Sequence, residues 1–418
     1  MSLLLNTSLV STPTVYNAGT LFGIVPTDPS SNNADITVTR ATTKTRINSA
    51  GLIETIAINV PSIDYSLGGC PNILLEPQRT NLFVRSEEFN TANWSSILGS
   101  VTANATISPS GSMDADRFTA DGSLGSHRLA QGVPITSGSA YTISCYVKKD
   151  TNDFFQFYLT SANFLSQAFA NFDVNNGVLG TLGANSIASS ITDAGNGWYR
   201  CSMTSNAVSS SATVSLNLSL ITTATSSRGS NNDLSTSIFV WGAQVEVGAY
   251  PTSYIPTTSA TVTRNSDVII RDNVYTNGLI TDAGGTWFIE IRNNLARSRD
   301  TGSGGLGLSD VSAGASNGFA LRIIGSTVRI VVSKYISGTP ISLFTTTTDT
   351  AKIAIKWNGL TADVFVNGVK VVTGTAFTAT NMEFLTNPSA IDVPKTINSM
   401  LLAPTPLTDD QCIALTTL

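Results

Sequence analysis

Apolar and polar residues alternate with a period of two along most of the chain, and this alternation limits what it can fold into. The clearest run is Val214-Ser-Leu-Asn-Leu-Ser-Leu220, whose four aliphatic residues share one side. Successive side chains of a strand point to opposite faces, so one face is expected to join a core and the other to face water. Similar alternation is found at 141–147, 155–159, 199–203, 241–247, 287–291, 328–332 and 353–357. Many short strands with turn-rich spacers predict an all-β protein built of antiparallel β-sandwiches.

Two local signals near the C-terminus predict a hairpin and a helix. Asn367-Gly368 lies between two apolar runs and supplies the two positive-φ residues of a type I′ turn. Thr408 is followed by acidic residues and by Gln411, which is the spacing of a capping box at a helix N-terminus. We therefore expect a tight hairpin at 367–368 and a short helical lid within 406–415.

Breaks in the alternation divide the chain into segments. Over residues 1–80, Pro, Asn and Thr punctuate short apolar runs and no long alternating strand is found, which predicts an extended N-terminal arm. Two prolines in a polar stretch before residue 258 indicate a connector. The expected order is the arm over 1–80, a jelly-roll sandwich over 81–257, the connector over 258–283 and a second sandwich over 284–418.

A short repeat precedes each expected sandwich. Thr37-Val-Thr-Arg40 recurs as Thr261-Val-Thr-Arg264, and each copy is followed by a Gly-Leu-Ile string. Two related connectors would explain the repeat, and chance recurrence of short Thr and Val strings is the alternative.

Composition excludes several classes of function. Charged residues make up 12% of the chain, against roughly 25% in soluble proteins, and the net charge is −5, so nucleic acid is not an expected partner. The single histidine, His127, rules out multi-histidine zinc sites, has no nucleophile elbow nearby and is expected at the surface. No metal or other cofactor is expected. The N-terminus lacks a signal-peptide pattern and no apolar run reaches about 18 residues, so we expect a protein without membrane insertion.

Four widely spaced cysteines indicate neither a redox motif nor a disulfide scaffold. Cys145 and Cys201 each alternate in step with apolar neighbours, which predicts buried free thiols. A disulfide between them is geometrically conceivable, but a protein without a secretion signal is expected to fold under reducing conditions, which would keep both thiols reduced.

Exposed aromatic rings are the side chains on which sugars stack, so the face of the strand on which each tryptophan lies decides whether it can bind a sugar. Trp241, Trp287 and Trp357 share parity with aliphatic neighbours and are expected in a core. Trp198 falls on the opposite side from Cys201, and Trp94 lies in a polar turn. These two are the candidate glycan-binding residues, although a tryptophan at a strand start also commonly packs under a loop.

Glycan hydrolysis needs two carboxylates about 5 to 10 Å apart, and the sequence contains no recognisable pair. The acidic candidates are scattered and suit turns, strand ends or a helix cap: Glu87, Glu88, Asp114, Asp116, Asp193, Glu246, Asp409 and Asp410. We therefore expect no enzymatic activity.

A long Gly- and Ser-rich loop is expected over 293–317. It contains Arg297, Arg299, Asp300 and Asp310 in an otherwise charge-poor chain. Its arginines would suit acidic sugars. A flexible tip or a contact between subunits is the other interpretation.

Long strings that occur in a fixed order carry a family likeness. They span residues 36–270 and include Arg46-Ile-Asn-Ser-Ala-Gly-Leu-Ile-Glu54, Leu74-Leu-Glu-Pro-Gln-Arg-Thr-Asn-Leu82, Gly197-Trp-Tyr-Arg-Cys201, Trp241-Gly-Ala-Gln-Val-Glu246 and Gly248-Ala-Tyr-Pro-Thr-Ser-Tyr-Ile-Pro256. Together they resemble a carbohydrate-binding-like jelly-roll module of virion-surface and tail proteins of tailed bacteriophages. The C-terminal part, with Trp357-Asn-Gly359 and the Asn367-Gly368 turn, resembles a laminin-G or concanavalin-A-like sandwich.

The resemblance implies a structural protein on the virion surface, such as a tail fibre or spike, assembled in the bacterial cytoplasm. It further implies docking to other virion proteins through the N-terminal arm, attachment to host cell-surface glycan and a homo-oligomer, with a trimer preferred. It does not discriminate tail from head. A head decoration or a collar or tail assembly protein without a ligand is the main alternative, and a glycan-degrading tail enzyme is the third.

Overall fold

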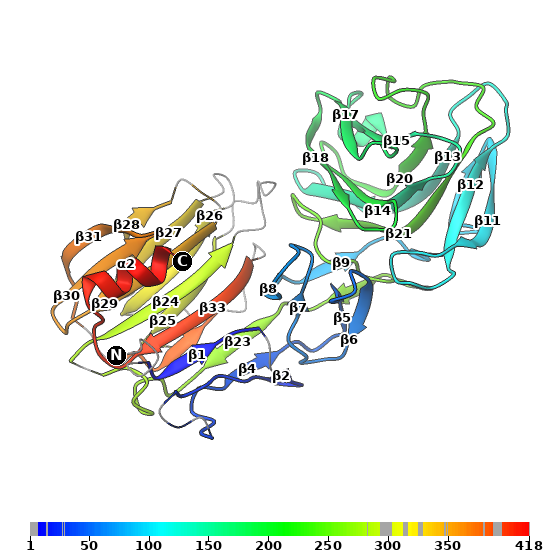
Figure 1. Ribbon diagram of the computed structural model, residues 1–418. Coiled ribbons are helices and arrows are strands. Elements are labelled where there is room, and N and C mark those ends of the chain that lie inside the picture. Colours follow the sequence, from blue (N-terminus) through cyan, green and yellow to red (C-terminus); the bar gives the residue numbers. More distant parts are fainter. Residues whose placement is uncertain are drawn as a thin grey trace. The chain divides into compact units, whose positions relative to one another are not determined.

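The computed structural model describes residues 7–13, 16–26, 28, 30–281, 283–292, 303–311, 317–324, 329–346, 348, 350–378, 381–387 and 395–417. The chain folds into two compact units (Figure 1). Unit 1 combines Met1–Lys44, Ile56–Gln78 and Asn265–Leu418, and unit 2 combines Thr45–Thr55 and Arg79–Arg264. Both units are built from antiparallel strands, so the expected all-β class is confirmed.

Unit 1 contains two large sheets. One has the strand order β31-β30-β29-β24-β33-β8-β7 with β1 beside β33, and the other has the order β2-β3-β4-β23-β32-β25-β26-β27-β28. The elements are β1 (Leu9–Ser11), β2 (Tyr16–Asn17), β3 (Thr20–Leu21), β4 (Ile36–Thr39), β7 (Ile63–Asp64), β8 (Asn72–Leu75), β23 (Val268–Arg271), β24 (Gly285–Arg292), β25 (Ser303–Ser309), β26 (Gly318–Ile324), β27 (Arg329–Ile336), β28 (Thr339–Thr345), β29 (Thr350–Trp357), β30 (Thr361–Val366), β31 (Val369–Ala376), β32 (Phe384–Thr386), β33 (Lys395–Ala403) and α2 (Asp409–Thr417).

Unit 2 is a sandwich of two sheets, ordered β10-β13-β20-β15-β16-β17 and β11-β12-β21-β14-β19-β18, with two short ribbons, β5-β6 and β22-β9. The elements are β5 (Lys44–Ile47), β6 (Ile53–Ile56), β9 (Arg79–Asn81), β10 (Ser95–Ile97), β11 (Gly99–Thr106), β12 (Ala115–Ala120), β13 (Arg128–Ile135), β14 (Ala140–Lys149), β15 (Phe154–Leu159), α1 (Ser161–Phe164), β16 (Phe169–Asp173), β17 (Val178–Leu182), β18 (Ser186–Asp193), β19 (Trp198–Asn206), β20 (Ser211–Leu220), β21 (Ser237–Val247) and β22 (Val262–Arg264).

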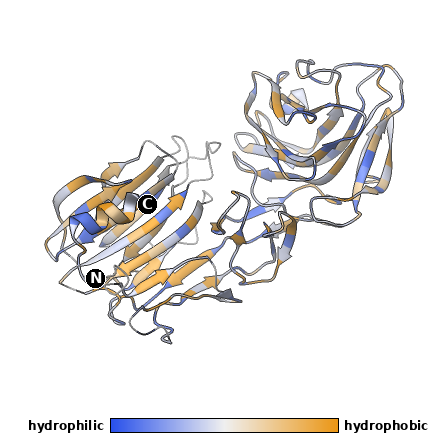
Figure 2. Ribbon diagram, viewed as in Figure 1, coloured by the Kyte–Doolittle hydropathy of each residue, from blue (hydrophilic) through white to orange (hydrophobic). Residues whose placement is uncertain are grey.

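The alternating runs became strands, and their apolar sides form the cores. Phe157 and Leu218 from one sheet of unit 2 share a buried cluster with Val147 and Met203 from the other. Figure 2 shows hydrophobic residues along the strands of both units. Only part of the polar side of β20 faces water as expected: Ser215 is exposed, whereas Asn217 donates to the Tyr158 carbonyl at 3.1 Å and is buried.

The observed units divide the chain differently from the expected order of arm, sandwich, connector and sandwich. In residues 1–80, β1 pairs with β33 and β4 pairs with β23, so these short strands extend the sheets of unit 1. Leu9, Leu21 and Ile36 are buried inside the chain. The expected connector contains β22 and β23, one in each unit. Short strands lack a visible period, but they complete edges that longer strands leave open.

Both local signals near the C-terminus are confirmed. Asn367 and Gly368 have φ of 48° and 81° between β30 and β31. At the start of α2, Thr408 N donates to Gln411 Oε1 at 2.9 Å and Gln411 N donates to Thr408 Oγ1 at 3.2 Å, which is a complete capping box. The helix packs on β29, β30 and β31, where Cys412 joins Phe288 and Phe365 in a buried cluster.

A β-bulge in β21 changes the face of one tryptophan. The register between β14 and β21 shifts between Ser144 and Tyr146, and Gly242 there has φ of 62°. Trp241 consequently lies on the outer face of its sheet, opposite Ala243 and Val245 in the core. It is buried as expected, but on the other side from its expected neighbours. Trp287 and Trp357 are buried, as expected.

A buried charge network connects distant segments of unit 1. Asp267 accepts from Arg40 Nη1 at 2.9 Å and from Lys44 Nζ at 2.7 Å, and Lys44 Nζ is 3.0 Å from Glu76 Oε2. These four side chains are at most 4% exposed and their charges sum to zero. Arg40 and Arg264, the last residues of the short repeat, are both buried.

Candidate functional site

Trp198 does not present its ring to solvent. The side chain is 1% exposed, and its Nε1 donates to the Ile107 carbonyl at 3.0 Å. It does lie on the opposite side of β19 from Cys201, but Ile53 of β6 and Tyr254 cover that face. The expected outward orientation is wrong because a second apolar layer, supplied by distant segments, covers the sheet.

Trp94 is also buried. Its ring packs between Phe83 and Phe89, with centroid distances of 4.9 and 4.8 Å, and its Nε1 donates to the Arg85 carbonyl at 3.0 Å. The polar sequence around it forms a turn that folds the indole inward. Neither sequence-predicted tryptophan therefore offers a face to a sugar.

His127, expected at the surface, is fully buried. Its Nδ1 lies 2.6 Å from the Leu98 carbonyl oxygen and its Nε2 lies 3.1 Å from the Asn232 carbonyl oxygen. The ring therefore joins two loops of unit 2.

The expected buried free thiols are confirmed. Cys145 and Cys201 face each other across β14 and β19, and both are fully buried and form no disulfide. Burial raises the pKa of the Cys145 thiol to about 12 and also raises that of Cys201. Cys70, in contrast, is exposed.

Several acidic candidates gather in unit 2. Burial raises the pKa of Glu87, which accepts from the Tyr254 hydroxyl at 2.9 Å and lies near Asp114. Burial also raises the pKa of Asp116, which accepts from the backbone N–H groups of Phe89 and Asn104, each at 2.9 Å. These contacts give Glu87 and Asp116 a role in holding loops together.

Most of the other acidic candidates have structural partners or are exposed, whereas Asp114 Oδ1 is buried and accepts no hydrogen bond from any described residue. Glu246 accepts from Thr252 N at 2.5 Å and from Thr252 Oγ1 at 2.7 Å, and burial raises its pKa. Asp193 accepts from the backbone of its own turn at 2.8 Å. Asp409 pairs with Lys370 at 3.0 Å, and Asp410 is exposed.

The segment 293–317 is not one long loop. Residues 303–309 form β25, which pairs with β26 on one side and β32 on the other. Arg297, Arg299 and Asp300 lie outside the described residues. Asp310 accepts from the backbone and side-chain amides of Asn317 at 2.8 and 3.1 Å.

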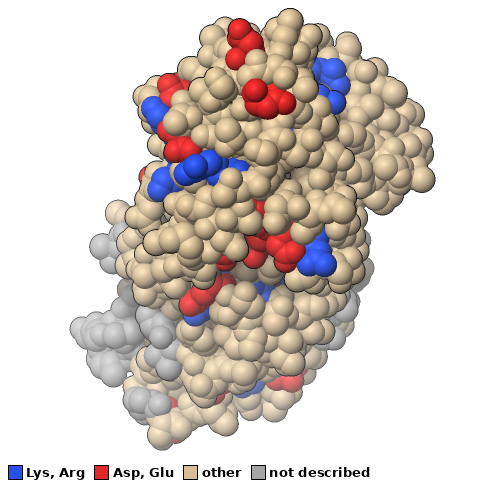
Figure 3. All heavy atoms as spheres, turned by 90° about the vertical axis from the view of Figure 1, so that its right-hand side faces the viewer, with Lys and Arg blue, Asp and Glu red and all other residues tan. Residues whose placement is uncertain are grey.

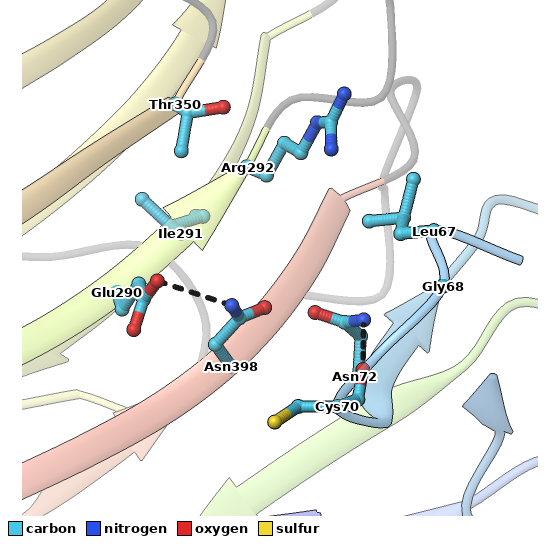
Figure 4. A pocket seen from close by; sticks show the side chains of 9 residues that line it. All are labelled: Leu67, Gly68, Cys70, Asn72, Glu290, Ile291, Arg292, Thr350 and Asn398. Atoms are coloured by element: carbon cyan, nitrogen blue, oxygen red, sulfur yellow. Dashed lines mark hydrogen bonds between the residues drawn. The ribbon is translucent and has the colours of Figure 1, made fainter. Parts of the chain in front are cut away.

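A pocket of about 290 Å³ opens on unit 1 where β8, β33 and β24 lie next to each other (Figure 4). Phe288 of β24 faces the α2 side of this sheet, and Glu290 and Arg292, two and four residues on, share that face. The helix covers β29 to β31, and the pocket lies on β24, β33 and β8. It is lined by Leu67, Gly68, Cys70, Asn72, Glu290, Ile291, Arg292, Thr350 and Asn398.

A β-bulge places Asn398 in this pocket. β33 pairs Ser399 with Glu290 and Ile397 with Ile291, so Asn398 is the extra residue. Its Nδ2 donates to Glu290 Oε1 at 3.1 Å. Bulges of this kind redirect one side chain and are frequent beside functional sites.

Asn72 supplies a buried hydrogen-bond acceptor to the pocket. The residue is 3% exposed, and its Nδ2 donates to the Cys70 carbonyl at 3.0 Å. Its Oδ1 is buried and accepts no hydrogen bond from any described residue. Figure 4 shows the amide nitrogen turned to Cys70 and the oxygen turned the other way, towards the side of Asn398. Because an unsatisfied buried oxygen costs about 1–3 kcal/mol, this atom favours a ligand that donates.

Sequence reasoning did not find this pocket. Its lining comes from residues 67–72, 290–292, 350 and 398, which are brought together by strand order and by a bulge. Asn and Glu at strand ends are common on surfaces and form no motif. Predicting the pocket would have required the strand order β24-β33-β8, which no local sequence pattern records.

The described residues contain no group of three or more His, Cys, Asp or Glu arranged to hold a metal ion. In the same part of the chain, no helix has the length and apolarity needed to cross a membrane. Figure 3 shows a face on which most atoms belong to neither acidic nor basic residues.

No protein-family model matches the chain, and no curated protein sequence is significantly similar to it. Among solved structures, the botulinum neurotoxin serotype D/C binding domain aligns at 15% identity and a TM-score of 0.27, over 36% of this chain and 40% of that one. A Trypanosoma rangeli sialidase mutant aligns at 10% identity and 0.28, over 92% and 77% of the two chains. The CBM22 tandem domain of Paenibacillus barcinonensis Xyn10C aligns at 11% and 0.24, over 78% and 98%. At these TM-scores the likenesses carry no argument about function.

Proposed function

We propose that this chain is a structural protein of the surface of a tailed-bacteriophage particle and that it binds host-surface glycan without cleaving it. The single observation that favours a ligand is the pocket of unit 1, with the buried acceptor oxygen of Asn72. Assignment to a virion rests on the ordered strings that resemble phage tail and virion-surface proteins.

Those strings have a structural role in this chain. Gln244 Oε1 accepts from Ile255 N at 2.7 Å, and the Glu246 carboxylate accepts from Thr252 N. The string that begins at Trp241 is therefore hydrogen-bonded to the string that begins at Gly248. Asn81 Nδ2 donates to the carbonyls of Ala243 and Ile255. Because these residues maintain the scaffold, the likeness supports a shared fold and a place in the virion. The residues that bind the ligand must be other ones.

A charge-poor surface suits a neutral ligand. With charged residues at 12% of the chain, affinity depends on hydrogen bonds and apolar contacts, so we expect binding to change little with salt. Single glycan sites of this kind are weak, and a symmetric homo-oligomer, with a trimer preferred, raises the avidity.

The test is binding of the purified oligomer to glycan arrays and to host cells at low and high salt. Binding at both salt concentrations, with no reducing ends released from host polysaccharide, is expected. Light scattering measures the number of copies, and an image of the intact particle locates the protein.

Two results would contradict this proposal, and each would favour a different function. An intact oligomer that binds no glycan and no cell favours an assembly protein without a ligand. Release of reducing ends that stops on Glu87→Gln favours a hydrolase instead, because Glu87 has a raised pKa and a carboxylate neighbour, as a general acid does.

A further inference from the structure

We propose that the pocket of unit 1 holds one terminal, uncharged pyranose ring, bound through its hydroxyl hydrogens by Asn72, Glu290 and Asn398. The inference rests on the proposed glycan-binding function and specifies its site and its ligand. The glycan is then recognised by its end and not along its length.

The lining is rich in acceptors that face the same space. Asn72 Oδ1 accepts from no described residue, and the Glu290 carboxylate has a second oxygen besides the one that accepts from Asn398. The Asn398 amide turns its nitrogen to Glu290, so its oxygen is the third acceptor. An amide oxygen and a carboxylate both require donors. A sugar presents neighbouring hydroxyl donors on a rigid ring, which matches acceptors contributed by adjacent strands.

Size favours a single ring. Pockets for drug-sized ligands measure about 300–1,000 Å³, and this one, at about 290 Å³, lies just below that range. Leu67, which is 38% exposed, supplies an apolar contact for the C–H face of a ring. A longer glycan would place its second ring outside the pocket.

Charge favours a neutral ring. The lining contains one carboxylate, Glu290, and one guanidinium, Arg292, two residues apart on the same face of β24. The pocket therefore offers no excess charge of either sign.

Cys70 provides a direct readout of occupancy. It lines the pocket and is exposed, whereas Cys145, Cys201 and Cys412 are buried. A ring in the pocket shields the Cys70 thiol from iodoacetamide, and the three buried thiols act as internal controls for unfolding. The rate of Cys70 alkylation is measured by peptide mass spectrometry on the full chain.

The probes are methyl glycosides of glucose, galactose, mannose and N-acetylglucosamine, glucuronic acid, and oligosaccharides that end in each neutral ring. At least one methyl glycoside is expected to slow Cys70 alkylation saturably, about 11-fold at ten times its Kd. The oligosaccharide with the same terminal ring is expected to protect with similar affinity.

Variants test the named acceptors. Asn72→Leu keeps the side-chain volume but removes the acceptor, and should weaken protection about tenfold, as expected for one lost hydrogen bond. If Asn72→Leu fails to fold, Glu290→Gln replaces it, because glutamine Oε1 still accepts from Asn398 while the charged acceptor is lost. Glu54→Gln, on β6 in unit 2, is the matched control and should leave protection unchanged.

The outcomes separate this inference from the proposed function. Glycan binding on arrays without Cys70 protection by any probe overturns the site and leaves the proposed function standing. Much tighter protection by oligosaccharides overturns end recognition, and stronger protection by glucuronic acid overturns the neutral ligand. Absence of both array binding and protection overturns the proposed function and this inference together.

Discussion

Asp267→Ala should destabilise unit 1 strongly, because it removes one carboxylate from a neutral buried network. Arg40 and Lys44 would keep their charges at 0% side-chain exposure, with Glu76 as the remaining acid. Loss of one partner from a buried ion pair costs about 3–5 kcal/mol. With a slope of about 2–3 kcal/mol per molar urea, the unfolding midpoint of unit 1 should fall by about 1–2.5 M.

The assay must follow each unit separately, since a chain of two units need not unfold in one step. Hydrogen exchange in urea reports unit 1 through β4, β8 and β23, and β14 and β19 of unit 2 serve as the internal reference. Asp409→Ala is the matched control. That carboxylate is 46% exposed in its ion pairs with lysines, so its removal should cost less than about 1 kcal/mol.

A double-mutant cycle with Arg40→Ala tests the reasoning further. The double variant should lose less free energy of unfolding than the sum of the losses in the two single variants, because it leaves no buried arginine without its partner. Equal costs for Asp267→Ala and Asp409→Ala, or strict additivity of the two changes, would refute the account of a coupled buried network.

Three further predictions follow from burial and ion pairing. Trp198→Ala should destabilise unit 2 by about 3–5 kcal/mol, measured by urea unfolding, and a loss below about 1 kcal/mol would contradict the packing of its indole. Cys145 and Cys201 should resist alkylation at pH 8 without denaturant, since burial raises the pKa of Cys145 to about 12; rapid modification would count against this. The hydrogen bond from Lys356 lowers the pKa of Asp409, so the carboxylate supports α2 above the ordinary Asp pKa of about 3.9 and this support is lost as pH falls through the lowered value. Hydrogen exchange of α2, corrected for intrinsic rates, should therefore be less protected at pH 2 than at pH 6, and equal protection would reject this role.

The strands and local turns were predictable because their physical causes are local. Period-two alternation marked the core strands, the Asn367-Gly368 pair marked the hairpin, and the Thr408 to Gln411 spacing marked the helix cap. The burial of Cys145 and Cys201 followed from parity alone. In each case the deciding contact lies within a few residues or within the pleat of one strand.

The candidate site was not predictable in this way. The local sequence of Trp198 and Trp94 predicts exposure, but segments from elsewhere in the chain cover Trp198, and the turn around Trp94 folds its indole onto Phe83 and Phe89. The pocket residues carried no signal, since Asn72 and Glu290 are 218 positions apart and meet only through the strand between them.

By itself, the sequence determined the all-β class, the position of most long strands and, where no bulge interrupts a strand, the face on which an alternating residue lies, because a strand's pleat has a fixed period. Tertiary structure alone decided which of those faces is covered, how the short strands within residues 1–44 and 56–78 complete the sheets of unit 1, and where bulges move Trp241 and Asn398. The physical reason is that exposure depends on what packs against a residue, and in a sheet protein the packing partners come from distant strands whose order no local pattern records.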